Sequence, residues 1–492
     1  MWRVRPEKVC PRPRREYQRG APSAFWRGRA IRCVSATTEV PMRSRTQETR
    51  RSIRRIAITR ERQDSQPSDA TLTAIDLFAG CGGATLGFKK EGLKVVAAVE
   101  VDRVSAETYR MNHPEVLLLE RDIRKISPRA LLKMAKLRRG EVTVVLGCPP
   151  CQGFSRVRRG APDRRNALVR VFAEFVVAIR PQFFVLENVP GLAQGGGRRV
   201  FKKALSLLKD SGYSIVFRVL NAADYGVPQR RKRVVVIGRL RRSVALPIPT
   251  HCSPTRPAIE ESGRIRLKPW VTVRQAIGRL KRLAAGKGDP DDPLHAAPAH
   301  SKIVLRRIRR IPRNGGSRSS LPKTLVLECH YDHDGHRDVY GRMKWSDIGP
   351  TITGGCDRVS KGRFIHPEQK RGITMREAAL LQTFPKSYLF AGGRSAVALQ
   401  IGNAVPVRFA RAMARAVKEA ALRSPPRPET AVEGTLMRLR ETFGNLMSDR
   451  AVRRQSERRT AHSGTVAATG ARRVAAGRYT GRTDRLVRAK AA

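Results

Sequence analysis

Short apolar runs that recur through the middle of the chain constrain its fold more than any other feature. These runs are nearly continuous in Val, Ile and Leu, which is typical of strands in a sheet that is covered on both faces. We predict strands at Thr73–Gly80, Lys94–Glu100, Glu115–Glu120, Val142–Gly147, Gln182–Asn188, Tyr213–Leu220 and Arg233–Gly238.

Longer amphipathic stretches separate the runs. We expect helices at Ala84–Glu91, Arg103–His113, Pro128–Arg138, Ala167–Arg180 and Arg199–Ser211. Strands that alternate with helices predict an α/β fold, a doubly wound parallel sheet. Ligands bind such sheets beyond the carboxyl ends of the strands. The residues that follow each apolar run are therefore the candidates for a functional site.

Changes in composition along the chain predict the domain boundaries. Residues 1–70 and 423–492 are rich in Arg and poor in large apolar residues, which favours disordered extensions. Residues 71–244 hold the α/β pattern, and residues 245–372, rich in Pro, Gly, Arg and His, form a second, smaller domain. A helical pattern resumes over residues 373–422. We assign this segment to the first domain and call it the C-terminal return. Met42 is an alternative start to Met1.

The charge of the chain indicates a polyanionic partner. The chain has 99 Lys and Arg residues against 41 Asp and Glu residues, which gives a net charge of +58. The electrostatic field of so large a positive charge attracts nucleic acid. No apolar run reaches the ~18 residues that span a bilayer. The eight cysteines are irregularly spaced, unlike a secreted disulfide framework. We expect a cytoplasmic protein without a membrane segment.

Glycines and acids follow three successive predicted strands. The first strand ends in DLFAGCGG (Asp76–Gly83), where glycine lets the backbone turn tightly and approach a ligand. Glu100 ends the second strand and Asp122 follows the third, and an acid at such a position accepts hydrogen bonds from a ribose diol. Singly these acids are more typical of ordinary loops and caps. Together they predict a nucleoside cofactor.

The stretch GCPPC (Gly147–Cys151) ends the fourth strand and has three interpretations. It is a metal or redox pair, a structural turn, or a nucleophile at the mouth of a pocket. A zinc site needs four ligands, and no second Cys-x-x-Cys exists in the chain. Glu187 ends the next strand, and a cysteine beside a buried acid suits attack on a ring activated by protonation, such as cytosine.

Six motifs occur in a fixed order: DLFAGCGG, GCPPCQGFS, FFVLENV, QRRKR (Gln229–Arg233), REAALLQTFP (Arg376–Pro385) and QIGNAVP (Gln400–Pro406). Together they resemble the motif set of the DNA (cytosine-5) methyltransferases, over 72–244 and 374–422. The resemblance implies a Rossmann-like methyltransferase fold that uses S-adenosylmethionine. It places a target-recognition domain at 245–372, and it implies methyl transfer to C5 of a flipped-out cytosine in double-stranded DNA, in restriction–modification or as a solitary enzyme.

The resemblance also assigns roles to individual residues. It implies that Cys151 is the nucleophile that bonds to C6, while Cys148 falls on a variable position. The other catalytic residues would be Glu187, Arg231 and Arg233. The cofactor would be held by Phe78, Ala79, Gly80, Gly82, Gly83, Glu100, Asp122, Ile123, Leu168 and Asn403, with Asn166 nearby. DNA would be contacted by Gln152, Ser155, Thr353, Lys361 and Arg363.

Several alternatives stay open. An RNA (tRNA) cytosine-5 methyltransferase shares the chemistry, although the Cys-Phe-Thr stretch of that branch is absent. An inactive, basic DNA-binding module is the alternative outside the enzymes. The stretch CHYDHDGHRD (Cys329–Asp338) has metal-ligand residue types, but its spacing favours a polar loop and no metal site. We expect a bacterial, nucleoid-associated monomer whose cognate restriction endonuclease is a functional partner only. The Arg-rich extensions either hold DNA phosphates or have no specific role.

Overall fold

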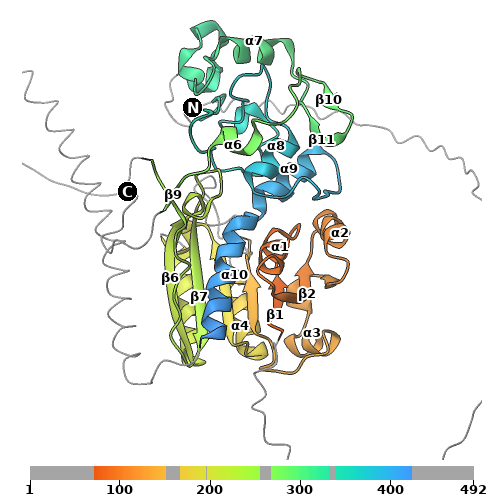
Figure 1. The fold of residues 1–492 in the computed structure, drawn as a ribbon, viewed down its shortest axis with the longest axis vertical. Helices are drawn as coiled ribbons and strands as arrows, with labels where there is room; N and C mark the ends of the chain where they lie inside the picture. Colours follow the sequence, from red (N-terminus) through yellow and green to blue (C-terminus); the bar gives the residue numbers. More distant parts are fainter. Residues whose placement is uncertain (1–70, 151–166, 195–196, 255–266, 332–337, 424–492) are drawn as a thin grey trace, which may run out of the picture. The chain divides into compact units, whose positions relative to one another are not determined.

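The computed structural model describes residues 71–150, 167–194, 197–254, 267–331 and 338–423. All of these described residues belong to one unit. The unit contains a large sheet with helices on both faces, together with a set of shorter elements that follows it in the chain (Figure 1).

The sheet has seven strands in the spatial order β3-β2-β1-β4-β5-β7-β6. Each predicted run forms a strand, which confirms the α/β fold, and only the ends differ by a few residues. The strands are β1 (Thr73–Leu77), β2 (Lys94–Glu100), β3 (Leu117–Glu120), β4 (Val144–Gly147), β5 (Phe183–Asn188), β6 (Tyr213–Asn221) and β7 (Lys232–Leu240).

The expectation of a fully parallel sheet is wrong for β7, the last strand of this sheet in chain order. Strands β1 to β5 pair in parallel with one another, whereas β7 runs antiparallel to both β5 and β6. The connection explains the difference. Residues 222–231 join β6 to β7 and hold only the short 3₁₀ helix η6 (Ala222–Tyr225), but a parallel return needs a crossover of about a dozen residues or more. Strand β7 therefore turns back directly and inserts between β5 and β6.

Helices cover both faces of the sheet, as a doubly wound fold requires. On one face, α3 (Pro128–Met134), α4 (Leu168–Ile179) and α5 (Arg198–Asp210) bury Leu131, Phe172 and Phe201 in one core cluster. On the other face, α1 (Gly83–Lys89), α2 (Arg103–Asn112) and α10 (Val407–Leu422) bury Phe88, Tyr109 and Phe409 in a second cluster. Neighbouring residues of β1 divide between the two clusters, because successive side chains of a strand point to opposite faces.

Local sequence signals fix where several of these helices begin. The side chain of Asp102 accepts a hydrogen bond from the amide of Ser105 at 2.9 Å and caps α2. Ser127 caps α3 in the same way and is followed by Pro128, which is suited to the first turn of a helix. These caps satisfy amides that the helix leaves without partners.

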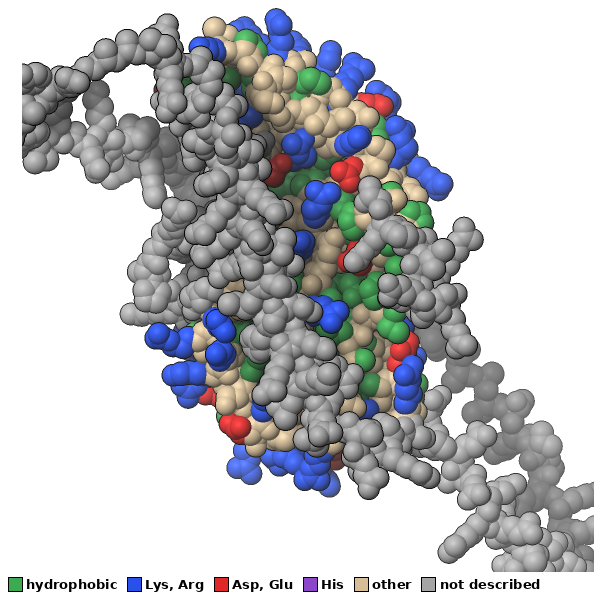
Figure 2. Space-filling view, turned by 90° about the vertical axis from the view of Figure 1, so that its left-hand side faces the viewer, with side chains coloured by type: hydrophobic (Ala, Val, Ile, Leu, Met, Phe, Trp, Pro, Cys, Tyr) green, Lys and Arg blue, Asp and Glu red, His purple; other side chains and the backbone are tan. Residues whose placement is uncertain are grey.

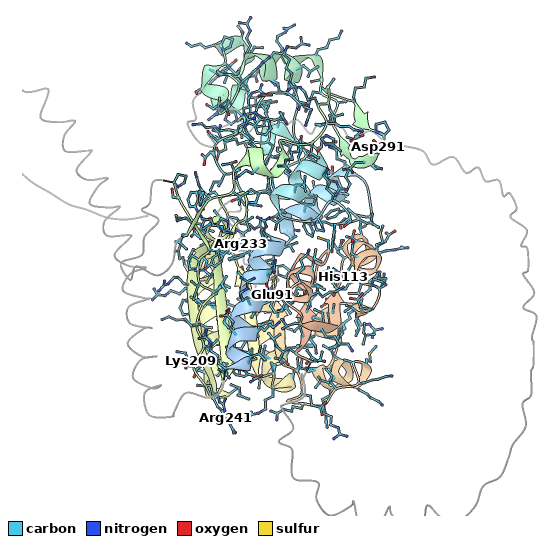
Figure 3. All side chains as sticks on the ribbon, in the orientation of Figure 1. Glu91, His113, Lys209, Arg233, Arg241 and Asp291 are labelled. Carbon is cyan, nitrogen blue, oxygen red and sulfur yellow. The ribbon has the colours of Figure 1, made fainter. Side chains whose placement is uncertain are left out.

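Helix α10 brings the C-terminal part of the described chain back onto the sheet. It packs directly on α1, where a Cβ added to Gly87 would lie 2.5 Å from the Cβ of Ala410. The carboxylate of Glu91, after α1, pairs with Arg411 at 2.5 Å and with Arg415 at 2.9 Å (Figure 3). The glycine and the ion pairs therefore attach α10 to the first helix of the fold.

Residues 245–372, which the sequence predicts to be a second domain, are called the second lobe below. Where they are described, they hold short elements: β8 (His251–Cys252), β9 (Lys268–Pro269), α6 (Val273–Ile277), β10 (Gly288–Asp289), β11 (Asp292–Ala296) and α7 (Lys302–Arg310). Helices α8 (Met375–Leu381) and α9 (Arg394–Asn403) follow it. Their side chains share one buried cluster with the lobe, which includes Val273, Met343, Phe364, Met375 and Ile401. The boundaries at 244 and 372 stay predictions, and the packing links α8 and α9 to the lobe.

Candidate functional site

The carboxyl ends of the parallel strands lie side by side at one edge of the sheet. Leu77, the last residue of β1, pairs with Gly147, the last residue of β4. Gly147 in turn pairs with Leu186 on β5, so Glu187 follows at the same edge. Arg233 lies near the start of the antiparallel strand β7, which brings it to this edge, while Arg241 marks the opposite end of the strand (Figure 3).

The glycine turn after β1 is held in a conformation that other residues rarely adopt. Phe78, Gly80 and Gly82 have φ angles of 70°, 55° and 88°, in the region that favours glycine. The amide of Ala79 donates to the carbonyl of Val99 on β2 at 2.9 Å. A Cβ on Gly80 would meet no atom within 4 Å. The turn therefore leaves open space in front of Gly80.

Glu100 ends β2 and binds this turn. Its carboxylate accepts hydrogen bonds from the amide of Gly80 at 2.7 Å, from Val101 at 2.9 Å and from Asp102 at 2.8 Å. Burial raises the pKa of Glu100 above its ordinary value, although these amides act in the opposite direction. A fixed acceptor beside open space fits the sugar hydroxyls of a nucleoside.

The remaining predicted cofactor residues lie in different settings. Asp122 caps the 3₁₀ helix η1 (Ile123–Lys125) and pairs with Arg124, and hydrogen bonds from that side chain lower the pKa of Asp122. Ile123 is buried, and Leu168 opens α4 and packs against the core. Asn403 ends α9 and is exposed. A Cβ on Gly83 would lie 2.6 Å from the carbonyl oxygen of Val405, so the chain after Asn403 packs against the turn. Their roles at a cofactor stay predictions.

Glu187 and Arg233 form a shielded ion pair at the edge of the sheet. Arg233 Nε lies 3.0 Å from Glu187 Oε1, and their side chains are 13% and 8% exposed, respectively. The antiparallel pairing of β5 with β7 places these residues on adjacent strands. The attraction between these opposite charges is stronger than it would be in bulk water, because both side chains are largely shielded from solvent. The structure therefore brings together these predicted catalytic residues.

Asn188, which the sequence analysis did not select, orders the chain that leads to Cys151. Its side-chain nitrogen donates to the carbonyl oxygen of Pro149 at 3.0 Å, and its oxygen accepts from the amide of Val189 at 2.9 Å. Asn188 is 2% exposed. A polar residue that ends an apolar strand was the available signal, since a buried amide side chain needs partners.

Cys148 lies close enough to Glu187 for that carboxylate to affect its ionisation. Burial raises the pKa of the Cys148 thiol well above its ordinary value, and the negative charge of Glu187 acts in the same direction. A thiol that stays protonated is a poor nucleophile. Cys151, Gln152, Ser155 and Asn166 lie outside the described residues, so their roles stay predictions.

Arg231 makes contacts that differ from the predicted contact with a target base. Its guanidinium donates to the carbonyl oxygen of Ile352 at 2.9 Å, of Gly402 at 3.1 Å and of Ala404 at 3.0 Å. Arg231 is 2% exposed. The side chain, just before β7, thus contacts a loop of the second lobe, the last turn of α9 and the first residue after that helix.

The predicted DNA-contacting residues of the second lobe also lie in different settings. Thr353 and Lys361 are exposed. The guanidinium of Arg363 donates to the carbonyl oxygens of Gly315, Gly316 and Arg342 at 3.1, 3.1 and 3.0 Å and pairs with Asp338. Arg363 therefore supports the fold of the lobe, and its contact with DNA stays a prediction.

The described surface is strongly basic. On the face shown in Figure 2, Lys and Arg side chains clearly outnumber Asp and Glu, as the net charge of +58 leads one to expect. Such a surface attracts polyanions. Within the described ranges, no cluster of three or more potential metal ligands occurs. No helix in those ranges is both long and apolar enough to span a bilayer.

Comparisons with known proteins identify the family of the chain. The family model for C-5 cytosine-specific DNA methylases matches residues 72–419. The type II methylase M.HgiDII of Herpetosiphon aurantiacus is 35% identical over 352 residues, which cover 70% of this chain and 94% of that protein. The type II methyltransferase M1.HphI of Haemophilus parahaemolyticus is 35% identical over 352 residues, which cover 70% of this chain and 87% of that protein.

A solved structure supports the fold independently. It is described as a candidate DNA modification methyltransferase encoded within a prophage (E. coli), and it superposes with a TM-score of 0.56 at 24% identity, over 72% of this chain and 100% of the other. The ordered motifs, the strand-end site and the match over most of the chain agree. The chain therefore belongs to the family of C-5 cytosine-specific DNA methylases.

Proposed function

We propose that this chain methylates C5 of a cytosine flipped out of a specific double-stranded DNA sequence, through a transient bond between Cys151 and C6. The observation that carries the proposal is the Glu187–Arg233 pair, 3.0 Å apart, at the sheet edge where the chain after Gly147 leads to Cys151. Flipping exposes C5 and C6, which the base stack covers, at a cost of about a few kcal/mol.

The residues at the ends of β1 and β2 fit S-adenosylmethionine as the cofactor. Glu100 would bind its ribose hydroxyls, and the open space in front of Gly80 would admit it. Asp122 and Ile123 would lie at the adenine, and Asn403 would close the site from the C-terminal return. When bound, S-adenosylmethionine supplies the methyl group on an electrophilic sulfonium.

The protein's own groups would activate the cytosine. Glu187, held by Arg233, supports positive charge at N3 of the ring, which makes C6 electrophilic. The thiolate of Cys151 adds to C6, and C5 gains the enamine character of a methyl acceptor. After methylation a base removes the proton from C5, and the electron pair of that C–H bond expels Cys151 by β-elimination. Water is the candidate base, and it passes this proton to the solvent, while the electron pair of the broken C–S bond returns to Cys151 as a thiolate.

Type II relatives support a role in restriction–modification. We propose that the chain acts as a monomer on double-stranded DNA, with a cognate restriction endonuclease as a functional partner that shares its site. Gln152, Ser155, Thr353 and Lys361 would contact the DNA.

Labelled methyl transfer tests this proposal. Purified protein should label double-stranded DNA and not tRNA, and bisulfite sequencing should place the product at C5 of one site. Cys151→Ala should abolish transfer while retaining DNA binding, whereas the control Cys148→Ala should keep transfer. Transfer by Cys151→Ala would refute the covalent mechanism. Labelling of tRNA but not of DNA would mean that the substrate is RNA.

A trapped adduct tests the bond itself. DNA with 5-fluorocytosine at the target carries no C5 proton, so elimination cannot follow methylation and the protein should stay attached to the DNA on a denaturing gel. Loss of that band in Cys151→Ala is expected. The same band in that variant would assign the bond to another residue.

A further inference from the structure

A tyrosine outside the residues assigned to the cofactor holds the glycine turn from behind. Tyr388 lies between α8 and α9 and is 3% exposed. Its hydroxyl donates a hydrogen bond to the carbonyl oxygen of Cys81. Because Cys81 stands between Gly80 and Gly82, the bond is made at the centre of the turn.

His113 orients this hydroxyl. His113 Nε2 lies 3.1 Å from the oxygen of Tyr388, and Nδ1 lies 3.4 Å from Lys89 Nζ. Burial lowers the pKa of His113 to about 4, so the ring is neutral near neutral pH. Since the tyrosine proton points to Cys81, Nε2 must carry the ring proton and donate to the tyrosine oxygen. Nδ1 is then the acceptor that the Lys89 ammonium requires, so one tautomer satisfies both of these contacts.

The segment that carries Tyr388 is fastened to α2. The side chain of Asn112 donates to the carbonyl of Leu389 at 3.0 Å and accepts from the amide of the same residue at 3.0 Å. The amide of Ala391 donates to Thr108 Oγ1 at 2.8 Å. These bonds fix the backbone that directly follows the tyrosine.

The same contact explains the glycine at position 82. Its φ of 88° is unfavourable for other residues, and an added Cβ would lie 2.6 Å from His113 Nε2 and 2.7 Å from the oxygen of Tyr388. On the opposite side, the amide of Gly80 is held by Glu100 at 2.7 Å. The turn is therefore fixed at two points, by Glu100 at the end of β2 and by Tyr388 between α8 and α9.

We propose that Tyr388 is a positioning residue for cofactor binding, whose hydroxyl fixes the carbonyl of Cys81 and with it the backbone of the turn from Ala79 to Gly83. This inference rests on the proposed function, because it takes the turn as the S-adenosylmethionine site. A turn that is already ordered binds its ligand more tightly than one that must be ordered on binding. Loss of the hydroxyl should therefore weaken cofactor binding without touching the reacting atoms.

Tyr388→Phe tests the role of the hydroxyl, with Tyr213→Phe as a matched control. Tyr213 is also buried and donates to a backbone carbonyl, that of Pro181 at 2.8 Å, before β5 and away from the carboxyl ends of the strands. By calorimetry, Tyr388→Phe should raise the Kd for S-adenosylmethionine about three- to tenfold, the range for one hydrogen bond. The KM for the cofactor should rise with it, while kcat at saturating cofactor stays unchanged. Tyr213→Phe should leave the Kd at the wild-type value.

A second variant covers the case in which Tyr388→Phe folds poorly. Asn112→Ala releases the segment from α2 at a partly exposed position and should raise the cofactor Kd in the same direction. A wild-type Kd in a folded Tyr388→Phe protein, or a fall in kcat without a change in Kd, would overturn the inference alone. If the wild-type protein bound no S-adenosylmethionine, the proposed function and this inference would both fail.

Discussion

Replacing Arg231 with Met should test whether this residue joins separate parts of the fold. Its buried guanidinium donates hydrogen bonds to the carbonyl oxygens of Ile352, Gly402 and Ala404 at 2.9 to 3.1 Å. Met fills part of the same volume but donates no hydrogen bond. The variant thus leaves polar atoms of two segments, the lobe loop and the turn between α9 and α10, without this donor.

The magnitude follows from what the carbonyls lose. A buried polar group left without its partner costs about 1–3 kcal/mol. Removal of the charged side chain also removes the desolvation that its burial requires, and local relaxation admits water to some carbonyls. We expect a net loss of about 3–5 kcal/mol, a large share of the roughly 5–15 kcal/mol that stabilises a typical domain.

Urea unfolding followed by circular dichroism measures this loss. The matched control is Arg230→Met, because the side chain of Arg230 is 60% exposed and lies 3.8 Å from Asp347, so its removal should cost less than about 1 kcal/mol. Arg231→Lys keeps a donor with shorter reach and should fall between the two. A loss below about 1 kcal/mol in Arg231→Met would refute the structural role and favour a contact with substrate alone.

Two further predictions concern stability: the first is the effect of lowering the pH, and the second is the effect of adding a methyl group at Gly402. Burial lowers the pKa of both His113 and His366 from 6.5 to about 4, so their contribution to stability is full above about pH 6.5 and falls as the pH drops toward 4, by about 2 kcal/mol each between pH 7 and 5. Burial raises the pKa of Asp76 to about 7, which acts in the opposite direction over this range. The test therefore compares the wild type with His366→Gln by urea unfolding at both pH values, and an equal pH dependence of the two proteins would contradict the prediction. Gly402→Ala should destabilise by about 1–3 kcal/mol although alanine favours helices, because its Cβ would lie 2.1 Å from the backbone nitrogen of Gly354. Gly393→Ala, with open space around the added Cβ, is the control, and equal melting temperatures of the two variants would count against the close approach.

Much of the sheet could be predicted because strand formation depends on short-range patterns. The apolar runs that end at Glu100 and Gly147 form strands with these same ends, since burial on both faces needs continuous apolar residues. The position of Glu187 at the edge of the sheet follows from the same pattern. The direction of β7 was not predicted, because it depends on how little structure the connection after β6 contains.

By itself, the sequence determined which segments become strands, where glycines and acids follow them, and to which family the chain belongs, because each depends on residues close together in the chain or on motif order. Only the tertiary structure decided which distant groups meet. Arg231 binds Ile352 across 121 residues, and Tyr388 reaches Cys81 across 307 residues. Such contacts depend on how whole helices pack. The sequence around a hydroxyl or guanidinium does not indicate which distant carbonyl oxygen it will bind.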